Sequence, residues 1–163
     1  MKKTFLILIF SNFLLSELVL EITQGTEDPY RVALVPFKGD KEISDTLNKV
    51  IQNNLVRSGE FKIFESEKLL SLPYNEEEIV FNDFKILNID YLVMGEILTE
   101  GSNISTEYQV FDIKKGSKVR TSTVYGIPNK NRQLGHYISD GIYEEITGIK
   151  GCLLYTSPSP RDS

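Results

Sequence analysis

The stretch Arg-Val-Ala-Leu-Val-Pro-Phe at residues 31–37 is a nearly continuous apolar run, and it decides the fold. A strand that is buried on both faces has this character, whereas a half-buried strand alternates apolar and polar residues. Pro36 has no amide hydrogen to donate to a ladder, so we expect the strand to end there or to lie beside an unpaired neighbour. A second run at 90–98, Asp-Tyr-Leu-Val-Met-Gly-Glu-Ile-Leu, has the same character. The two runs predict the centre of a sheet.

Three helices are predicted around these strands, at residues 41–57, 75–87 and 132–146. In the first, apolar side chains recur at helical spacing, with Asp40 as a plausible N-cap and Gly59 as the residue that follows the C-cap. The face that this helix should bury consists of Ile43, Leu47, Val50, Ile51 and Leu55. The face of the last helix consists of Leu134, Ile138, Gly141, Ile142 and Ile146.

Three further segments, 61–64, 104–113 and 118–125, alternate in the period of two that indicates strands. Early strands therefore alternate with helices, and the last three strands form a meander. This order predicts the α/β class, with a mixed β-sheet of about five strands and helices packed on it. Four aromatic residues within these strands are expected to lie in the core: Tyr91, Tyr108, Phe111 and Tyr125.

The N-terminus has the composition of a secretory signal peptide over residues 1–16. Lys2 and Lys3 precede a short apolar stretch that ends at Glu17. The alternative is an uncleaved membrane anchor, but the apolar run is shorter than the roughly 20 residues that a membrane span needs. We therefore expect export, with the mature chain starting near Glu17.

The segment that would follow the cleavage site alternates like a strand. It consists of Glu17, Leu18, Val19, Leu20, Glu21, Ile22, Thr23, Gln24, Gly25 and Thr26. A strand at a free terminus either pairs within its own sheet or adds to the sheet edge of a partner. Which set of side chains would face a partner, Leu18 with Leu20 and Ile22 or the alternate set, is not fixed by the pattern.

The composition argues against several classes of function. With a net charge of −5 and a pI near 5.0, a phosphate-binding surface for nucleic acid is not favoured. One histidine, His136, and one cysteine, Cys152, cannot build a multi-His or multi-Cys metal site. His136 with Asp140 four residues later is the only candidate acid–base pair, and helix packing is the better interpretation. We expect no enzymatic activity, no metal and no cofactor.

Residues 152–163 have no helix or strand period and carry two of the six prolines. They resemble the translation of a sequencing-library adaptor, so we expect an artefactual tail that follows residue 151 and contributes nothing to the fold.

Several segments, in order and spacing, resemble the TolB amino-terminal domain family. They are Glu-Ile-Thr-Gln-Gly at 21–25, Val-Pro-Phe at 35–37, Leu-Val-Arg-Ser-Gly-Glu-Phe at 55–61, Asn-Ile-Asp-Tyr-Leu-Val-Met-Gly-Glu-Ile at 88–97, Tyr-Gln-Val-Phe-Asp at 108–112, Gly-His-Tyr-Ile-Ser-Asp at 135–140 and Glu-Glu-Ile-Thr-Gly-Ile-Lys-Gly at 144–151. The resemblance implies that residues 27–151 form an α/β domain similar to the anticodon-binding fold.

The resemblance also implies a periplasmic location and a non-enzymatic role in the Tol–Pal envelope system, which supports outer-membrane integrity, cell division and import of colicin-like proteins. In that family the mature N-terminal strand engages the periplasmic domain of TolA, and carried over by position this strand is 17–26. Binding of the lipoprotein Pal belongs to a β-propeller that follows the domain in the family. An alternative resemblance, to relatives of the curli-secretion lipoprotein, would imply an outer-membrane secretion accessory.

Overall fold

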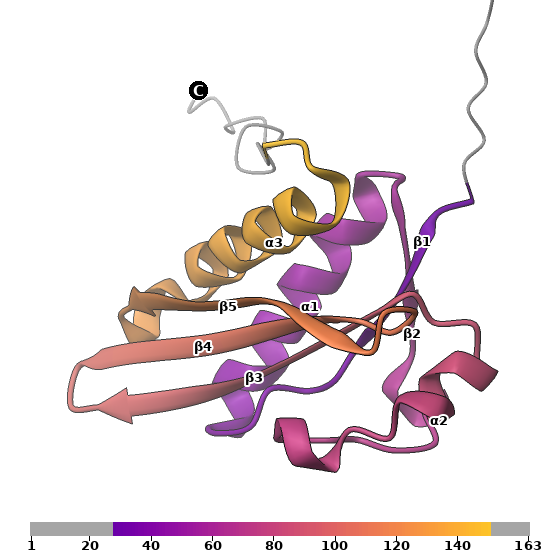
Figure 1. Ribbon diagram of the computed structural model, residues 1–163. Coiled ribbons are helices and arrows are strands. Elements are labelled where there is room, and N and C mark those ends of the chain that lie inside the picture. The colour runs from indigo at the N-terminus through magenta and orange to yellow at the C-terminus, as the bar shows by residue number, and fades with distance from the viewer. Residues whose placement is uncertain (1–27, 151–163) are drawn as a thin grey trace, which may run out of the picture.

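The computed structural model describes residues 28–150, which build one mixed sheet with the strand order β2-β1-β3-β4-β5 (Figure 1). The strands are β1 (Tyr30–Leu34), β2 (Phe61–Phe64), β3 (Tyr91–Glu100), β4 (Asn103–Asp112) and β5 (Ser117–Gly126). The helices are α1 (Lys41–Arg57), α2 (Phe81–Ile86) and α3 (Asn131–Thr147). β1 runs parallel to β2 and β3, while β3, β4 and β5 form an antiparallel meander. The predicted α/β class and the mixed five-stranded sheet are confirmed.

β1 is buried on both faces, as its apolar run predicts. Val32 and Leu34 belong to the core on one side of the sheet, and Ala33 and Val35 to the core on the other. The strand ends at Leu34, shortly before Pro36, but the chain stays beside β3: the amide of Val35 donates to the carbonyl of Val93 at 2.9 Å. The pairing resumes beyond the proline, where Lys38 forms a parallel bridge with Glu96, so Pro36 lies in an interruption of the ladder.

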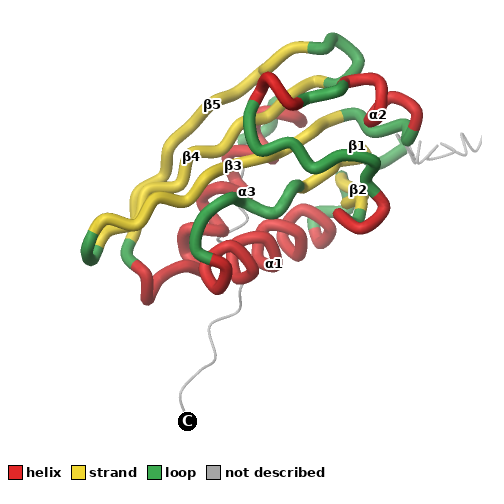
Figure 2. The backbone as a smooth tube through the Cα atoms, turned by 90° about the horizontal axis from the view of Figure 1, so that it is seen from below, coloured by secondary structure: helices red, strands yellow, loops and turns green. Residues whose placement is uncertain are grey.

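One face of the sheet is covered by α1 and α3, which lie side by side (Figure 2). α1 has the predicted bounds because both of its ends are specified locally. The carboxylate of Asp40 accepts a hydrogen bond from the amide of Ile43 at 3.0 Å, and Gly59 takes a positive φ of 81° after the C-cap Ser58. The apolar faces predicted for the first and last helices are buried.

The opposite face is covered by α2 and the irregular segment before it, and here the prediction of one helix over 75–87 is wrong. The segment contains a 3₁₀ turn at Glu76–Glu78, an extended break, and then α2. Ile79 and Phe84 both lie in the core on this side. Five residues apart, they would point in directions about 140° apart on one α-helix. The break lets both reach the sheet.

The meander joins its strands through tight turns in which Gly101 and Gly116 take the positive φ values 59° and 69°. Tyr108 and Phe111 are buried as expected, and Tyr91 is half-buried. Tyr125 is 77% exposed, so its predicted core position is wrong. It lies in the edge strand β5 on the same face as Ser105 and Leu98, which is beyond the reach of α2.

Three predictions concern residues outside the described range: the signal peptide at 1–16, the strand at 17–26 and the artefactual tail at 152–163. They stay predictions. Within residues 28–150, no helix has both the length and the apolar character needed to cross a membrane.

Candidate functional site

The predicted partner-binding strand at 17–26 joins the described fold where the chain enters the sheet. This junction is the candidate site. We call residues 28–31 the root, because the segment 17–26 joins the described fold through them. Asp28 and Pro29 are exposed, whereas Tyr30 and Arg31 are partly buried as the first residues of β1. The root is thus the transition from exposed chain to sheet.

Tyr30 fixes the root on one side of β1. Its amide donates to the carbonyl of Glu60 at 2.9 Å, immediately before β2 begins. Its ring lies 6.0 Å from that of Phe61 and 5.8 Å, edge to face, from that of Tyr91, measured between ring centroids. Such aromatic pairs contribute about 0.5–1.5 kcal/mol beyond the area that they bury. The tyrosine therefore ties β1 to both neighbouring strands at its first residue.

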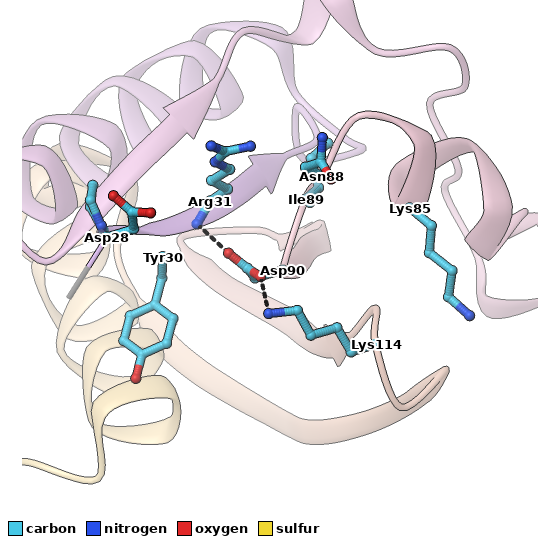
Figure 3. A pocket seen from close by; sticks show the side chains of 9 residues that line it. Asp28, Tyr30, Arg31, Lys85, Asn88, Ile89, Asp90 and Lys114 are labelled. Carbon is cyan, nitrogen blue, oxygen red and sulfur yellow. Dashed lines mark hydrogen bonds and ion pairs between the residues drawn. The ribbon is translucent and has the colours of Figure 1, made fainter.

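Asp90 fixes the root on the other side. Its carboxylate accepts a hydrogen bond from the amide of Arg31 at 3.0 Å, and its own amide donates to the carbonyl of Arg31 at 2.8 Å. The second carboxylate oxygen pairs with the ammonium of Lys114 at 2.7 Å (Figure 3). The hydrogen bond and the charge of Asp90 raise the pKa of Lys114 above its ordinary value. Arg31 is therefore held to β3 at both its backbone donor and its acceptor.

The two strands that flank β1 both turn away at the root. Before β2 the chain comes from α1 through Gly59, and before β3 it comes from α2 through Asn88, which takes a positive φ of 54°. Within residues 28–150, the pairing of β1 with both neighbours therefore begins at the root.

A cleft of about 500 Å³ lies at the root. We call it the root cleft; its lining includes Asp28, Tyr30, Arg31, Lys85, Asp90 and Lys114 (Figure 3). The side chains come from β1, from the end of α2, and from the turns that flank β3 and β4. The cleft is therefore a junction of segments distant in sequence, and the pattern of residues alone did not predict it. The one available signal was a carboxylate, Asp90, directly before a buried strand.

The side chains around His136, the alternative candidate site, connect α1 to α3 by hydrogen bonds. The side-chain amide of Asn54 on α1 lies 2.8 Å from Nδ1 of His136 and also donates to the hydroxyl of Ser139 at 3.0 Å. Ser139 donates to the carbonyl of Gly135 at 2.6 Å and is fully buried. Burial lowers the pKa of His136, and the charge of Arg132 lowers it further. The histidine joins two packed helices, which agrees with the interpretation of helix packing.

The fold and its anchored root define the class of the chain: an α/β domain in which a mixed sheet has two long helices on one face and a short helix on the other. The family model described as the TolB amino-terminal domain matches residues 18–119. The chain belongs to the TolB family. The match begins inside the predicted strand at 17–26, so that segment is part of the family's domain.

Relatives and a solved structure agree with this assignment. The chain is 33% identical over 153 residues to the Tol-Pal system protein TolB of Alcanivorax borkumensis, covering 91% of this chain and 35% of that protein. It is 31% identical over 134 residues to the protein of the same name from Pseudomonas aeruginosa, covering 81% and 31%. The crystal structure of TolB from Acinetobacter baumannii superposes with a TM-score of 0.66 at 29% identity, covering 76% and 29%.

The chain therefore spans about a third of the length of the curated relatives that it matches. The comparisons confirm the resemblance to the TolB amino-terminal domain and do not favour the alternative, a relative of the curli-secretion lipoprotein.

Proposed function

We propose that this chain acts in the Tol–Pal envelope system by adding its N-terminal strand, residues 17–26, to the periplasmic domain of TolA. The observation that carries the proposal is the geometry of the root. Arg31 and Tyr30 are fixed to the sheet, while both flanking strands turn away before residue 28. The segment 17–26 thus joins a rigid base, and the described pairing of β1 with β2 and β3 begins only at that base, which supports pairing of the segment with a partner.

Strand addition suits a segment of this composition. Main-chain hydrogen bonds to a sheet edge provide affinity, and alternate side chains enter pockets of the partner. Ten extended residues span about 33 Å at ~3.3 Å each, enough to cover a whole strand of a small domain. Three residues, Glu27, Asp28 and Pro29, separate the segment from β1. A partner strand would therefore lie close to the root.

The role requires export, which the predicted signal peptide at residues 1–16 would provide. We propose a periplasmic location, no enzymatic activity, and a contribution to outer-membrane integrity, cell division and import of colicin-like proteins. Binding of Pal is a separate matter. Residues 28–150 build one five-stranded sheet and not a propeller, so we assign Pal binding only to full-length members of the family.

The test is a deletion of residues 17–26 in the exported chain, with affinity for the purified TolA periplasmic domain measured by isothermal calorimetry. The matched control replaces the same ten residues by a permuted sequence of the same composition in which the apolar residues no longer alternate. We expect the deletion to abolish binding and the permuted control to weaken it strongly. An affinity unchanged by the deletion would overturn the proposal. Urea unfolding of each variant shows whether residues 28–150 still fold.

A further inference from the structure

The root cleft carries two basic side chains that the fold itself does not use. Lys85 is exposed in the last turn of α2, and Arg31 is half-buried at the start of β1. No ion pair within residues 28–150 engages the ammonium of Lys85 or the guanidinium of Arg31. Both side chains line the cleft (Figure 3). They are free to bind an anion.

The two carboxylates of the cleft do not balance its positive charge. Asp90 already accepts from the amide of Arg31 and pairs with Lys114, so its charge is satisfied inside the fold. Asp28 is exposed. The lining holds three cations (Arg31, Lys85 and Lys114) and two carboxylates (Asp28 and Asp90), which leaves a balance of +1. The whole chain has a net charge of −5. The cleft is therefore a local reversal of the protein's overall charge.

The main-chain hydrogen bonds of strand addition give little selectivity by themselves, because they are alike for every sequence. Charged groups beside an added strand supply orientation, rejection of wrong partners and faster association. The lining of the root cleft begins at Asp28, two residues after the end of the segment 17–26, so a partner that binds this segment would lie close to the cleft.

We propose that the root cleft attracts acidic side chains of the protein that accepts the N-terminal strand, with Lys85 and Arg31 as two separate cationic contacts on opposite sides of the cleft. The inference rests on the proposed function, and it adds a second contact to that interface. Lys114 is not one of the contacts, because Asp90 holds it at 2.7 Å. The contact determines how fast and in which orientation the partner docks, while the strand determines how long it stays.

The experiment measures association and dissociation rates for the purified TolA periplasmic domain, with the exported chain immobilised, at about 20 mM and about 500 mM salt. The test variants are Lys85→Glu and Arg31→Gln, which leave the backbone bonds of Arg31 to Asp90 in place. The matched control is Lys41→Glu. It makes the same change in net charge at the first turn of α1, which lies at the other end of β1 and tolerates an acidic residue. The deletion of residues 17–26 is run in parallel.

We expect Lys85→Glu to slow association about three- to tenfold at low salt and Arg31→Gln by less, with the difference lost at high salt and dissociation unchanged. The control should associate at nearly the original rate. The proposal is overturned if Lys85→Glu associates normally, or if Lys41→Glu slows association equally, since the effect is then one of net charge. The deletion separates the two ideas: normal binding by the deleted chain contradicts the strand, whatever the cleft variants do.

Discussion

Asp90 and Arg31 are joined by two hydrogen bonds across the parallel strands β3 and β1. The carboxylate of Asp90 accepts from the amide of Arg31 at 3.0 Å, and the amide of Asp90 donates to the carbonyl of Arg31 at 2.8 Å. The two bonds hold Arg31 at the N-terminal end of β1, where the described chain enters the sheet. The side chain of Asp90 thus supplies the acceptor for the amide of Arg31, in place of a backbone carbonyl of the neighbouring strand.

Replacing Asp90 by alanine should lower the free energy of unfolding by about 1–3 kcal/mol, because the partly buried amide of Arg31 loses its acceptor. Lys114→Met removes only an exposed member of the ion pair and should cost less than about 1 kcal/mol. Urea unfolding measures both, with the exposed Glu77→Ala as the control. Equal costs for Asp90→Ala and Glu77→Ala would show that the hydrogen bond contributes nothing.

Gly141→Ala should destabilise the domain, although alanine favours a helix by about 1 kcal/mol over glycine. A Cβ at this position in α3 would collide with the hydroxyl of Tyr108, which lies beneath the helix on β4. Overpacking of this kind costs about 1–3 kcal/mol. The double variant Gly141→Ala with Tyr108→Phe should recover part of the loss. A stabilised single variant would contradict the close packing of α3 on the sheet.

Stability should fall on acidification through His136. Burial chiefly lowers its pKa below the ordinary 6.5, Arg132 and Arg57 add to this, and Asp140 opposes it. The unfolded chain therefore takes up the proton at a higher pH than the folded chain. The contribution is fully present above 6.5 and is lost as the pH falls through the lowered pKa of the folded state. Protonation also ends acceptance by Nδ1 of the hydrogen bond from Asn54.

The measurement is urea unfolding at a series of pH values that starts at about pH 7.5 and continues below the ordinary 6.5 of histidine. The control is His136→Gln, which cannot titrate and should show a flatter profile. Identical profiles for the two proteins would exclude His136 as the source.

A strand in the segment 17–26 should present one set of side chains to its partner, because successive residues point to opposite faces. Serine at Leu18, Leu20 and Ile22 is compared with serine at Val19, Glu21 and Thr23. We expect one triple variant to weaken binding to the TolA periplasmic domain at least about tenfold more than the other, as measured by calorimetry. Equal losses would contradict binding as a strand with a single buried face.

The elements that the sequence predicts well are those that local residues specify. α1 has its predicted bounds because Asp40 and Gly59 mark its ends and its apolar face has one period. The apolar run of β1 likewise predicts burial on both faces, which the two core clusters confirm. Such signals need no knowledge of distant contacts.

The features that sequence reasoning missed depend on the tertiary arrangement. The acidic start at Glu76–Glu78 suggests one helix over 75–87. Ile79 and Phe84 both pack in the same core, which a continuous helix would not allow, so the segment is interrupted between them. Tyr125 follows a strand pattern, yet α2 does not extend over β5 to cover it. The bond from Arg31 to Asp90 spans 59 residues of sequence, so the root cleft appears only once the strands are ordered.

The central claim is that residues 17–26 become a strand of a shared sheet when TolA binds. The most direct measurement is amide hydrogen exchange of the exported chain with and without the purified TolA periplasmic domain, read at single-residue resolution. We expect alternate amides of residues 17–26 to become strongly protected on binding, because strand addition engages every second amide with the partner's edge. Protection confined to residues 28–150, with the segment exchanging as fast as before, would contradict the claim.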